Sequence, residues 1–204
     1  MMTLYYAPGA CSMAAHIVLE ESGEKYQPQQ VDLAGGEQRT EAYLKINPQG
    51  RVPVLRLDNG EPLAENTAIL PYLGRRFGLW PTEAVADAKA LSLIGFFAAS
   101  VHPAHAHVGR PERYAADPSA FPTLKETGLK AFHGYLKQID DKLAGREWFG
   151  DKYSVLDCRI PNKQILIDEI AAWEHDRNAN HTKADWQFTT KNARIKLKHL
   201  YPAI

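Results

Sequence analysis

The pattern of apolar and polar positions over the first 78 residues predicts a small sheet with helices between its strands. Short runs that alternate, or that are rich in aromatic and β-branched residues, predict strands, and Gly, Pro or Asn bounds them. Apolar side chains at helical spacing predict helices, which end at a glycine or before a proline. The predicted strands are Thr3–Ala7, Tyr26–Leu33, Val52–Asp58 and Glu61–Glu65, and the predicted helices are the one closed by Gly23, Thr40–Asn47 and Glu65–Gly78.

The order β-α-β-α-β-β-α describes a compact α/β sheet domain. Asn59-Gly60, between the last two predicted strands, is a strong hairpin signal because both residues tolerate a positive φ. After a linker at Gly78–Glu83 the pattern changes to helices only. Helices are predicted at Ala84 to about Val101, at Ser119 to about Leu143 and from Tyr153–Asp157, where Ser154 and Asp157 have the spacing of a capping box. We therefore expect an α/β domain over 1–80 and an all-α domain over 84–158.

Composition is that of an ordinary globular protein. The chain has 204 residues, no formal net charge, 45% apolar and 24% charged residues, and its neutral balance argues against a nucleic-acid partner. We find no window of about 18 uncharged apolar residues and expect no membrane span. Met1 does not begin a basic segment followed by a hydrophobic one, so secretion is not expected. With only Cys11 and Cys158, no disulfide framework is expected and a reducing, cytoplasmic location is predicted.

The stretch YYAPGACSMAAHIVLEESG, from Tyr5 to Gly23, places Cys11 where the first helix begins. The helix dipole and the open N–H groups there favour negative charge, so a thiol loses its proton more readily. The same groups can instead hold the sulfur of a bound thiol, with the Ser12 hydroxyl as a further donor. Without a C-x-x-C motif a dithiol cycle is disfavoured, whereas a monothiol cycle with an external thiol stays open. A buried cysteine that packs as a small apolar residue is the structural alternative.

Two further segments indicate binding of a peptide-like ligand. In NPQGRVPVL (Asn47–Leu55), Pro53 cannot donate to a sheet ladder and belongs at an edge, and the Val52–Pro53 bond is a candidate cis peptide. The Val52 backbone can then pair with a ligand as an added strand. In AEN, Glu65 and Asn66 open a helix whose N-terminus accepts a carboxylate, while the Glu65 side chain accepts an ammonium group. An edge proline and simple helix capping are the structural alternatives.

These segments, in this order, resemble the N-terminal domain of cytosolic glutathione transferases, and above all the bacterial beta class. The similarity runs from Thr3 to about Trp80 and rests on YYAPGACS, NPQGRVPVL, LDNG and LAENTAILPYL. It implies a thioredoxin-like α/β N-terminal domain that binds glutathione, followed by an all-α C-terminal domain, in a homodimer. The implied reaction is attack of the glutathione thiolate on a small hydrophobic electrophile held in an apolar cleft between the domains.

Carried over by position, the resemblance implies that Cys11 contacts the glutathione sulfur. The Val52 backbone would pair with the cysteinyl unit, and Pro53 matches the cis-proline of the family. Glu65 and Asn66 match the pair that holds the γ-glutamyl end of glutathione.

Three other residues near this site carry weaker signals. Arg51 stands where the class often has glutamine. Tyr5 and Tyr6 offer a competing way to activate the thiol, because other classes use a tyrosine from this region. We rank Cys11 and Ser12 above the two tyrosines because GACS is the more beta-like feature.

Three histidines, at His102, His105 and His107, lie in the segment HPAHAH. Imidazole suits zinc, but no cysteine or carboxylate is nearby and Pro103 interrupts regular helical spacing, so we expect no metal site. The resemblance matches His102 to a histidine that faces the glutathione site in beta-class relatives, where it would stabilise the thiolate. The structural alternative is a polar surface loop between helices.

The resemblance stops after EWFGDKYSVLDC. Family members continue the helix that the capping box begins, whereas here Arg159 follows and Pro161 would break such a helix. In residues 159–204, EIAAWEHDRN and ADWQFTTKNARIKLKHLYP resemble the C-terminus of insertion-sequence transposases of the DDE type. We infer that a mobile element supplied this end, without transposase activity, and we expect a chain of low stability.

The sequence leaves three functions open. The first is a transferase that conjugates glutathione to small electrophiles through a site around Cys11. The second is a catalytically impaired remnant that still binds glutathione. The third is a reductase of glutathione mixed disulfides that uses Cys11 as its only thiol.

Overall fold

The computed structural model of the chain describes residues 1–157, so Cys158 and the predicted tail 159–204 lie outside the described residues. Contacts divide the described chain into two compact units, at Met1–Glu65 and from Asn66 onward. The helix that follows Glu65, which the sequence assigned to the first domain, therefore groups with the later helices. It does so because it packs against the segment around Trp80 and against Val155, both of which approach Gly74.

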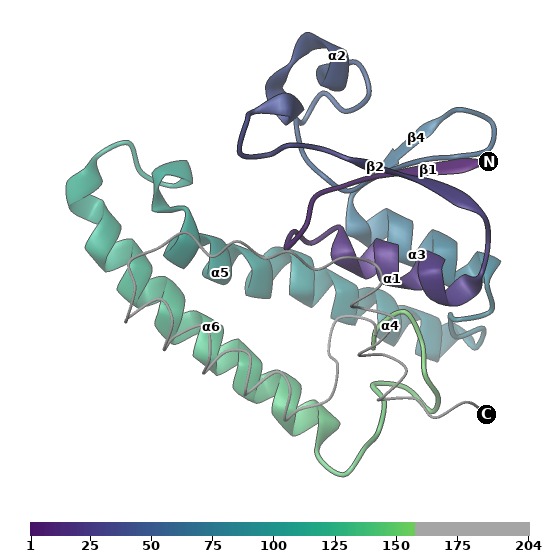
Figure 1. The fold of residues 1–204 in the computed structure, drawn as a ribbon. Coiled ribbons are helices and arrows are strands. Elements are labelled where there is room, and N and C mark those ends of the chain that lie inside the picture. The colour runs from purple at the N-terminus through teal and green to yellow at the C-terminus, as the bar shows by residue number, and fades with distance from the viewer. Residues whose placement is uncertain (158–204) are drawn as a thin grey trace. The chain divides into compact units, whose positions relative to one another are not determined.

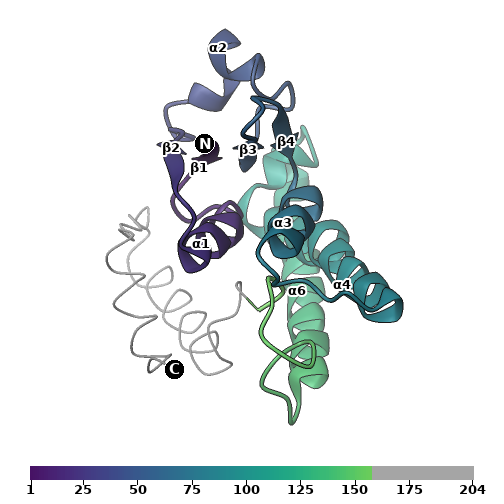
Figure 2. The same cartoon turned by 90° about the vertical axis from the view of Figure 1, so that its right-hand side faces the viewer.

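The first unit is built around a four-stranded mixed sheet. Its strands lie in the order β2-β1-β3-β4, with β1 parallel to β2 and antiparallel to β3, and β3 antiparallel to β4. Figure 2 shows the four strands side by side, with helix α1 on one side of the sheet and the α2 segment on the other. The strands are β1 (Met2–Tyr6), β2 (Tyr26–Gln30), β3 (Val54–Arg56) and β4 (Pro62–Ala64).

Helix α1 ends where the sequence predicts, whereas the second helix spans only Glu41–Leu44 of the predicted Thr40–Asn47. Helix α1 (Met13–Ser22) buries four apolar side chains and is closed by Gly23, whose φ of 68° is left-handed and favours glycine. Thr40 accepts the Tyr43 N–H and caps the short helix α2 (Glu41–Leu44), which follows the 3₁₀ turn η1 (Glu37–Arg39). The predicted Asn59-Gly60 hairpin joins β3 to β4. This βαβ start followed by a β-hairpin is a thioredoxin-like arrangement, as predicted.

The second unit is helical (Figure 1). Helices α5 and α6 pack side by side and approach closely at Gly128. Any larger residue at this position would have no room, because its Cβ would lie 2.6 Å from the His107 Cβ. The elements are α3 (Asn66–Arg76), α4 (Ala84–Phe96), η2 (Phe97–Val101), α5 (His102–Gly109), η3 (Pro111–Arg113), η4 (Pro118–Ala120) and α6 (Phe121–Leu143).

The expectation that Pro103 interrupts the helix was wrong, and HPAHAH is not a loop. The chain stays helical from Ala84 to Gly109 because η2 is a π-helical turn, in which the His102 N–H donates to the Phe97 carbonyl. The wider turn relieves the clash between a proline ring and the preceding turn, and Pro103 occupies the first turn of α5, where proline is tolerated.

The same run, Ala84–Gly109, is long and apolar enough to cross a membrane by length and composition alone. Core helices of globular proteins meet this criterion too, and 17% of the most apolar stretch is buried here. The search for about 18 uncharged apolar residues did not select this run, and the expectation of no membrane span stays a prediction. The polar residues in the last part of the run are mainly histidines. A criterion that counts only Asp, Glu, Lys and Arg as charged therefore accepts the run as apolar.

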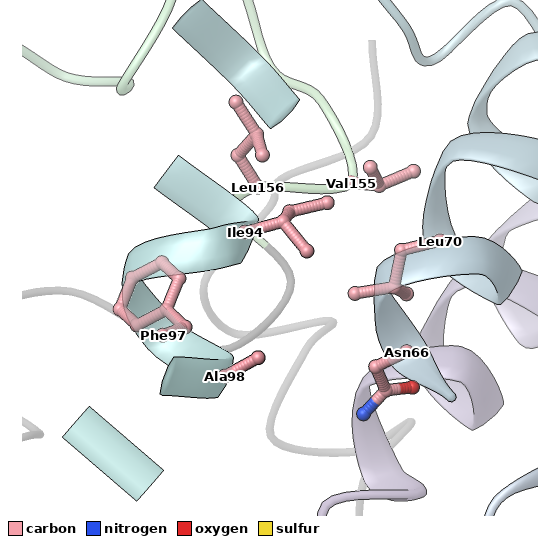
Figure 3. A pocket seen from close by; sticks show the side chains of 7 residues that line it. All are labelled: Asn66, Leu70, Ile94, Phe97, Ala98, Val155 and Leu156. Atoms are coloured by element: carbon pink, nitrogen blue, oxygen red, sulfur yellow. The ribbon is translucent and has the colours of Figure 1, made fainter. Parts of the chain in front are cut away.

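The predicted capping box forms at the end of the described chain. The Asp157 carboxylate accepts the Ser154 N–H at 2.9 Å and the Ser154 hydroxyl at 3.0 Å, and the Ser154 hydroxyl accepts the Leu156 N–H at 3.3 Å. Asp157 also accepts the Phe149 N–H, and burial raises the pKa of its carboxyl. Val155 and Leu156 of this turn line a small apolar pocket with residues of α3, α4 and η2 (Figure 3).

Candidate functional site

The turn between β1 and α1 places the Cys11 thiol at the start of a helix, as the sequence predicts. Gly9 turns the chain with a φ of 68°, and the Ala10 N–H donates to the Ala7 carbonyl at 3.2 Å. Helix α1 begins two residues after Cys11, and the Cys11 side chain is half-buried. Cys11 therefore lies in the first-turn environment in which open N–H groups favour negative charge.

The Ser12 side chain points into the protein. It is fully buried, and its hydroxyl donates to the Ala7 carbonyl and accepts the Ala7 N–H, both at 3.1 Å. A hydroxyl has one proton to donate. The Ser12 hydroxyl uses its proton in the hydrogen bond to the Ala7 carbonyl, so it has no further proton to donate to the sulfur of a ligand. Its two hydrogen bonds to Ala7 fix the turn that carries Cys11.

Cys11 meets the segment around Pro53 from a position 41 residues earlier in the chain. Its thiol donates to the Val52 carbonyl at 3.5 Å. The Val52–Pro53 peptide is cis, as predicted, and both residues are buried. The structure thus joins two of the three predicted segments, and it does so through a thiol and a backbone carbonyl.

Sequence reasoning missed two side chains that hold the residue before Val52. The Tyr43 hydroxyl and the Asn47 side-chain amide both donate to the Arg51 carbonyl at 2.8 Å. The Arg51 side chain is exposed, so the main chain of this residue is fixed while its guanidinium faces solvent. The one available signal was that Asn47 directly precedes Pro48, which marks a turn. The local pattern does not identify the Arg51 carbonyl as the hydrogen-bond partner of the Asn47 side chain.

The two tyrosines of β1 point to opposite faces of the sheet, as neighbours in a strand must. The Tyr6 ring packs against His16 of α1, with ring centres 4.6 Å apart, whereas the Tyr5 ring packs edge-on against Tyr43 at 6.0 Å. Tyr6 therefore packs with the helix side of the sheet. Tyr5 lies on the side of the segment that carries Arg51 and Val52.

Glu65 and Asn66 stand at the junction of β4 and α3. Glu65 is exposed and has a φ of 68°, and no other non-glycine residue of the described chain has a positive φ. Such a backbone state costs energy for a residue with a side chain and is concentrated at ligand-binding sites. Asn66 is the first residue of α3, and its amide lies at the polar rim of the apolar pocket, near Leu70 (Figure 3).

His102 belongs to the second unit, where it is exposed at the first residue of α5. The other two histidines of HPAHAH pack on aromatic rings: His105 against Phe132, and His107 against Tyr114 with centres 3.9 Å apart. Within residues 1–157, no group of three or more His, Cys, Asp and Glu side chains is arranged to hold a metal ion.

Known proteins are similar to this chain in both sequence and fold. The model of the family "Glutathione S-transferase, N-terminal domain" matches residues 9–76. The glutathione S-transferase GstA of Escherichia coli O157:H7 is 31% identical over 165 residues, which cover 78% of this chain and 79% of that protein.

Among solved structures, a glutathione transferase homologue from Sulfitobacter with bound glutathione is similar with a TM-score of 0.76 and 30% identity, covering 98% of this chain and 99% of that one. A beta-class glutathione S-transferase from Sphingomonas chungbukensis gives a TM-score of 0.70 at 28% identity, covering 97% and 94%. The similarity extends over both the sheet and the helices. This chain belongs to the glutathione S-transferase family.

Proposed function

We propose that this chain is a glutathione transferase that joins the sulfur of glutathione to the electrophilic carbon of a small apolar molecule. The observation that carries the proposal is the Cys11 thiol, held at the start of α1 against the Val52 carbonyl and beside Pro53. The glutathione bound to the similar Sulfitobacter protein supports the choice of co-substrate.

In the proposed reaction the glutathione thiol gives its proton to solvent, and the thiolate attacks the carbon. A C–S bond forms while the leaving group departs with its electron pair, so no oxidant or reductant is needed. The N-terminus of α1 stabilises the negative sulfur. The Cys11 thiol is a weak donor that can turn from the Val52 carbonyl to the ligand sulfur.

The backbone of Val52 and the β4–α3 junction would hold the rest of the tripeptide. The Val52 main chain would pair with the cysteinyl unit in the manner of an added strand. Glu65 would accept the ammonium group of the γ-glutamyl end, and Asn66 with the first N–H groups of α3 would bind its carboxylate. The left-handed backbone of Glu65 supports a ligand role for this junction.

Four further residues take supporting roles in the proposed site. The exposed Arg51 guanidinium would attract the glycyl carboxylate of glutathione. Tyr6 and His102 remain proposed contributors, as a glutathione contact and a stabiliser of the thiolate. Ser12 is proposed as a positioning residue for the turn rather than as a donor to sulfur, because Ala7 takes its proton.

We also propose a beta-class homodimer that accepts a small hydrophobic electrophile. The largely exposed apolar run from Ala84 to Gly109, with Val85 59% and Leu91 41% exposed, supports association through the second unit. For residues 159–204 we propose an origin in a mobile element. Sequencing the locus tests that origin, and a neighbouring element remnant is expected.

The decisive experiment is a calorimetric titration of the full, size-exclusion-purified chain with glutathione. Binding is expected, and a folded chain that releases no heat contradicts the proposal. Conjugation to a chlorinated aromatic electrophile, assayed beside reduction of hydroxyethyl disulfide, separates transferase from reductase. Cys11→Ala is expected to abolish disulfide reduction and to lower conjugation by about tenfold, the value of one weak donor to a charged sulfur.

Cys11→Ser is the matched control, because its hydroxyl can still donate to the sulfur but cannot form a mixed disulfide. It is expected to keep more conjugation than Cys11→Ala while losing disulfide reduction. Binding without turnover of either substrate would identify the chain as a glutathione-binding remnant.

A further inference from the structure

The peptide between Arg51 and Val52 is held from one side by two side chains. Its carbonyl accepts the Tyr43 hydroxyl and the Asn47 amide, each at 2.8 Å. Both donors come from α2 and the residues just after it. A backbone carbonyl has two lone pairs, and both are engaged here although the Arg51 side chain itself is exposed.

Tyr43 is a fixed donor. It is 3% exposed and packs in a small apolar cluster that also contains Val52, Val31 and Ala7. Burial, with smaller effects of Tyr5 and Glu37, raises the pKa of its hydroxyl to about 12, so the phenol keeps its proton at every pH at which the protein works. The hydrogen bond to Arg51 is therefore independent of pH in that range.

Asn47 is equally constrained. It is 4% exposed, its Oδ1 accepts the Gln49 N–H at 3.1 Å, and its carbonyl accepts the Gly50 N–H at 2.9 Å. With Oδ1 engaged by Gln49, the Nδ2 group faces Arg51. The asparagine thus ties the turn at 47–50 to the Arg51 carbonyl.

Geometry then fixes where the Val52 N–H points. A trans peptide is planar, and its carbonyl and N–H point in opposite directions. The Arg51–Val52 bond is trans, because Val52–Pro53 is the cis bond found in the described chain. With the Arg51 carbonyl directed toward Tyr43 and Asn47, the Val52 N–H is directed away from both.

Within residues 1–157 no group accepts a hydrogen bond from this N–H, although Val52 is only 9% exposed. An open backbone donor at a buried residue is rare and is expected to serve a ligand. We propose that Tyr43 and Asn47 are positioning residues that hold the Arg51 carbonyl so that the Val52 N–H stays aimed at the cysteinyl carbonyl of glutathione. This inference rests on the proposed function.

Without the two donors the Arg51–Val52 peptide can rotate, and binding must first restore its orientation. The N–H contact exists in the ground state and in the transition state alike, so its loss weakens binding without slowing the bound complex. A role in folding alone would instead reduce the fraction of chains that bind, at unchanged affinity.

The test is calorimetric titration of the full chain with glutathione, for Tyr43→Phe, Asn47→Ala and the double variant. Calorimetry separates the dissociation constant from the number of sites. Each single variant is expected to raise the dissociation constant about threefold and the double variant more than about tenfold, because either donor alone still holds the carbonyl. The number of sites per folded chain is expected to stay unchanged.

Tyr26→Phe is the matched control, since it removes a phenol hydrogen bond of the same unit, from Tyr26 to Glu20, at 2.5 Å. Its dissociation constant is expected to equal that of the unmodified chain. As a second readout, the Val52 amide signal in ¹H–¹⁵N spectra is expected to move in Tyr43→Phe and to respond less to glutathione than in the control.

The outcomes separate this inference from the proposed function. If the unmodified chain does not bind glutathione, the proposed function is wrong. If it binds, and Tyr43→Phe changes neither its affinity nor the Val52 signal, the positioning role is wrong. If the double variant fails to fold, Tyr43→Phe alone decides whether the positioning role holds. This variant keeps the buried ring and loses only the hydroxyl.

Discussion

At the scale of the residue, Glu65 shows how the chain departs from its local preferences where a ligand is proposed to bind. Every other positive φ in the described chain belongs to a glycine. For an L-residue with a side chain the left-handed conformation costs about 1–2 kcal/mol. Glu65 therefore carries a conformational cost that glycine at this position would avoid.

Glu65→Gly is expected to stabilise the fold by about 1 kcal/mol, because it removes the left-handed strain. It is also expected to weaken glutathione binding, because the carboxylate is lost. Urea unfolding and calorimetry measure the two effects. Glu65→Gln keeps the strained backbone, so it should weaken binding with no gain in stability; a stabilised Gln variant would show that strain is not the cause.

At the scale of the element, α1 is attached to the sheet by an aromatic cluster around a half-buried histidine. The His16 ring packs against Tyr6 of β1 and Tyr26 of β2, with ring centres 4.6 and 5.9 Å away. Burial lowers the pKa of His16 from 6.5, and the nearby Glu20 carboxylate opposes this shift only in part. The packing of α1 on β1 and β2 thus keeps an imidazole neutral.

This cluster predicts a loss of stability in mild acid. The unfolded chain binds the His16 proton near pH 6.5, whereas the folded chain binds it only at lower pH. The contribution is therefore fully present above pH 6.5 and is lost as the pH falls below it, with a slope for one proton of at most about 1.4 kcal/mol per pH unit.

Denaturant unfolding of the chain and of His16→Phe between pH 8 and 5 gives the unfolding free energy at each pH. Its slope is expected to correspond to at most about one proton taken up on unfolding. The phenylalanine keeps the ring contacts and cannot titrate, so its profile is expected to lack the acid loss. Glu20→Gln removes the opposing carboxylate, and its profile should fall more steeply. Identical slopes in all three proteins would exclude His16 as the source.

At the scale of the whole molecule, a family fold over residues 1–157 precedes a tail for which we propose an origin outside the family. The sheet and the helices to residue 157 match glutathione S-transferases, and the capping box that precedes the core helix of the predicted all-α domain is formed. The sequence places Pro161 four residues beyond that box. A helix begun at Ser154 would lose its continuation there, and with it several buried aliphatic side chains worth about 1.5–3 kcal/mol each.

The full chain is therefore expected to melt at a lower temperature than GstA of Escherichia coli O157:H7 under the same conditions. Typical domain stabilities of about 5–15 kcal/mol leave little room for such a loss. Thermal unfolding followed by circular dichroism compares the two proteins. A midpoint equal to that of GstA, or above it, would show that the helical unit is complete without the family sequence.

Whether the sequence alone predicts a feature depends on how far apart in the chain the interacting residues lie. The strands, the helices, the Asn59-Gly60 hairpin and the capping box follow from neighbours within four residues, so local pattern predicts them. The helix through Pro103 was missed because a π turn changes the hydrogen-bond register, which apolar spacing does not reveal.

The sequence by itself determined the order of the elements and placed Cys11 at a helix start, and it marked Val52–Pro53 as a candidate cis bond. Only the tertiary structure decided what the polar side chains do there: Ser12 turns back to Ala7, and Cys11 meets Val52 across 41 residues of chain. Two donors from another segment likewise settle on the Arg51 carbonyl. Periodicity reports which face of an element is buried, whereas the partner of a polar group is set by segments that meet only when the sheet and its loops have packed.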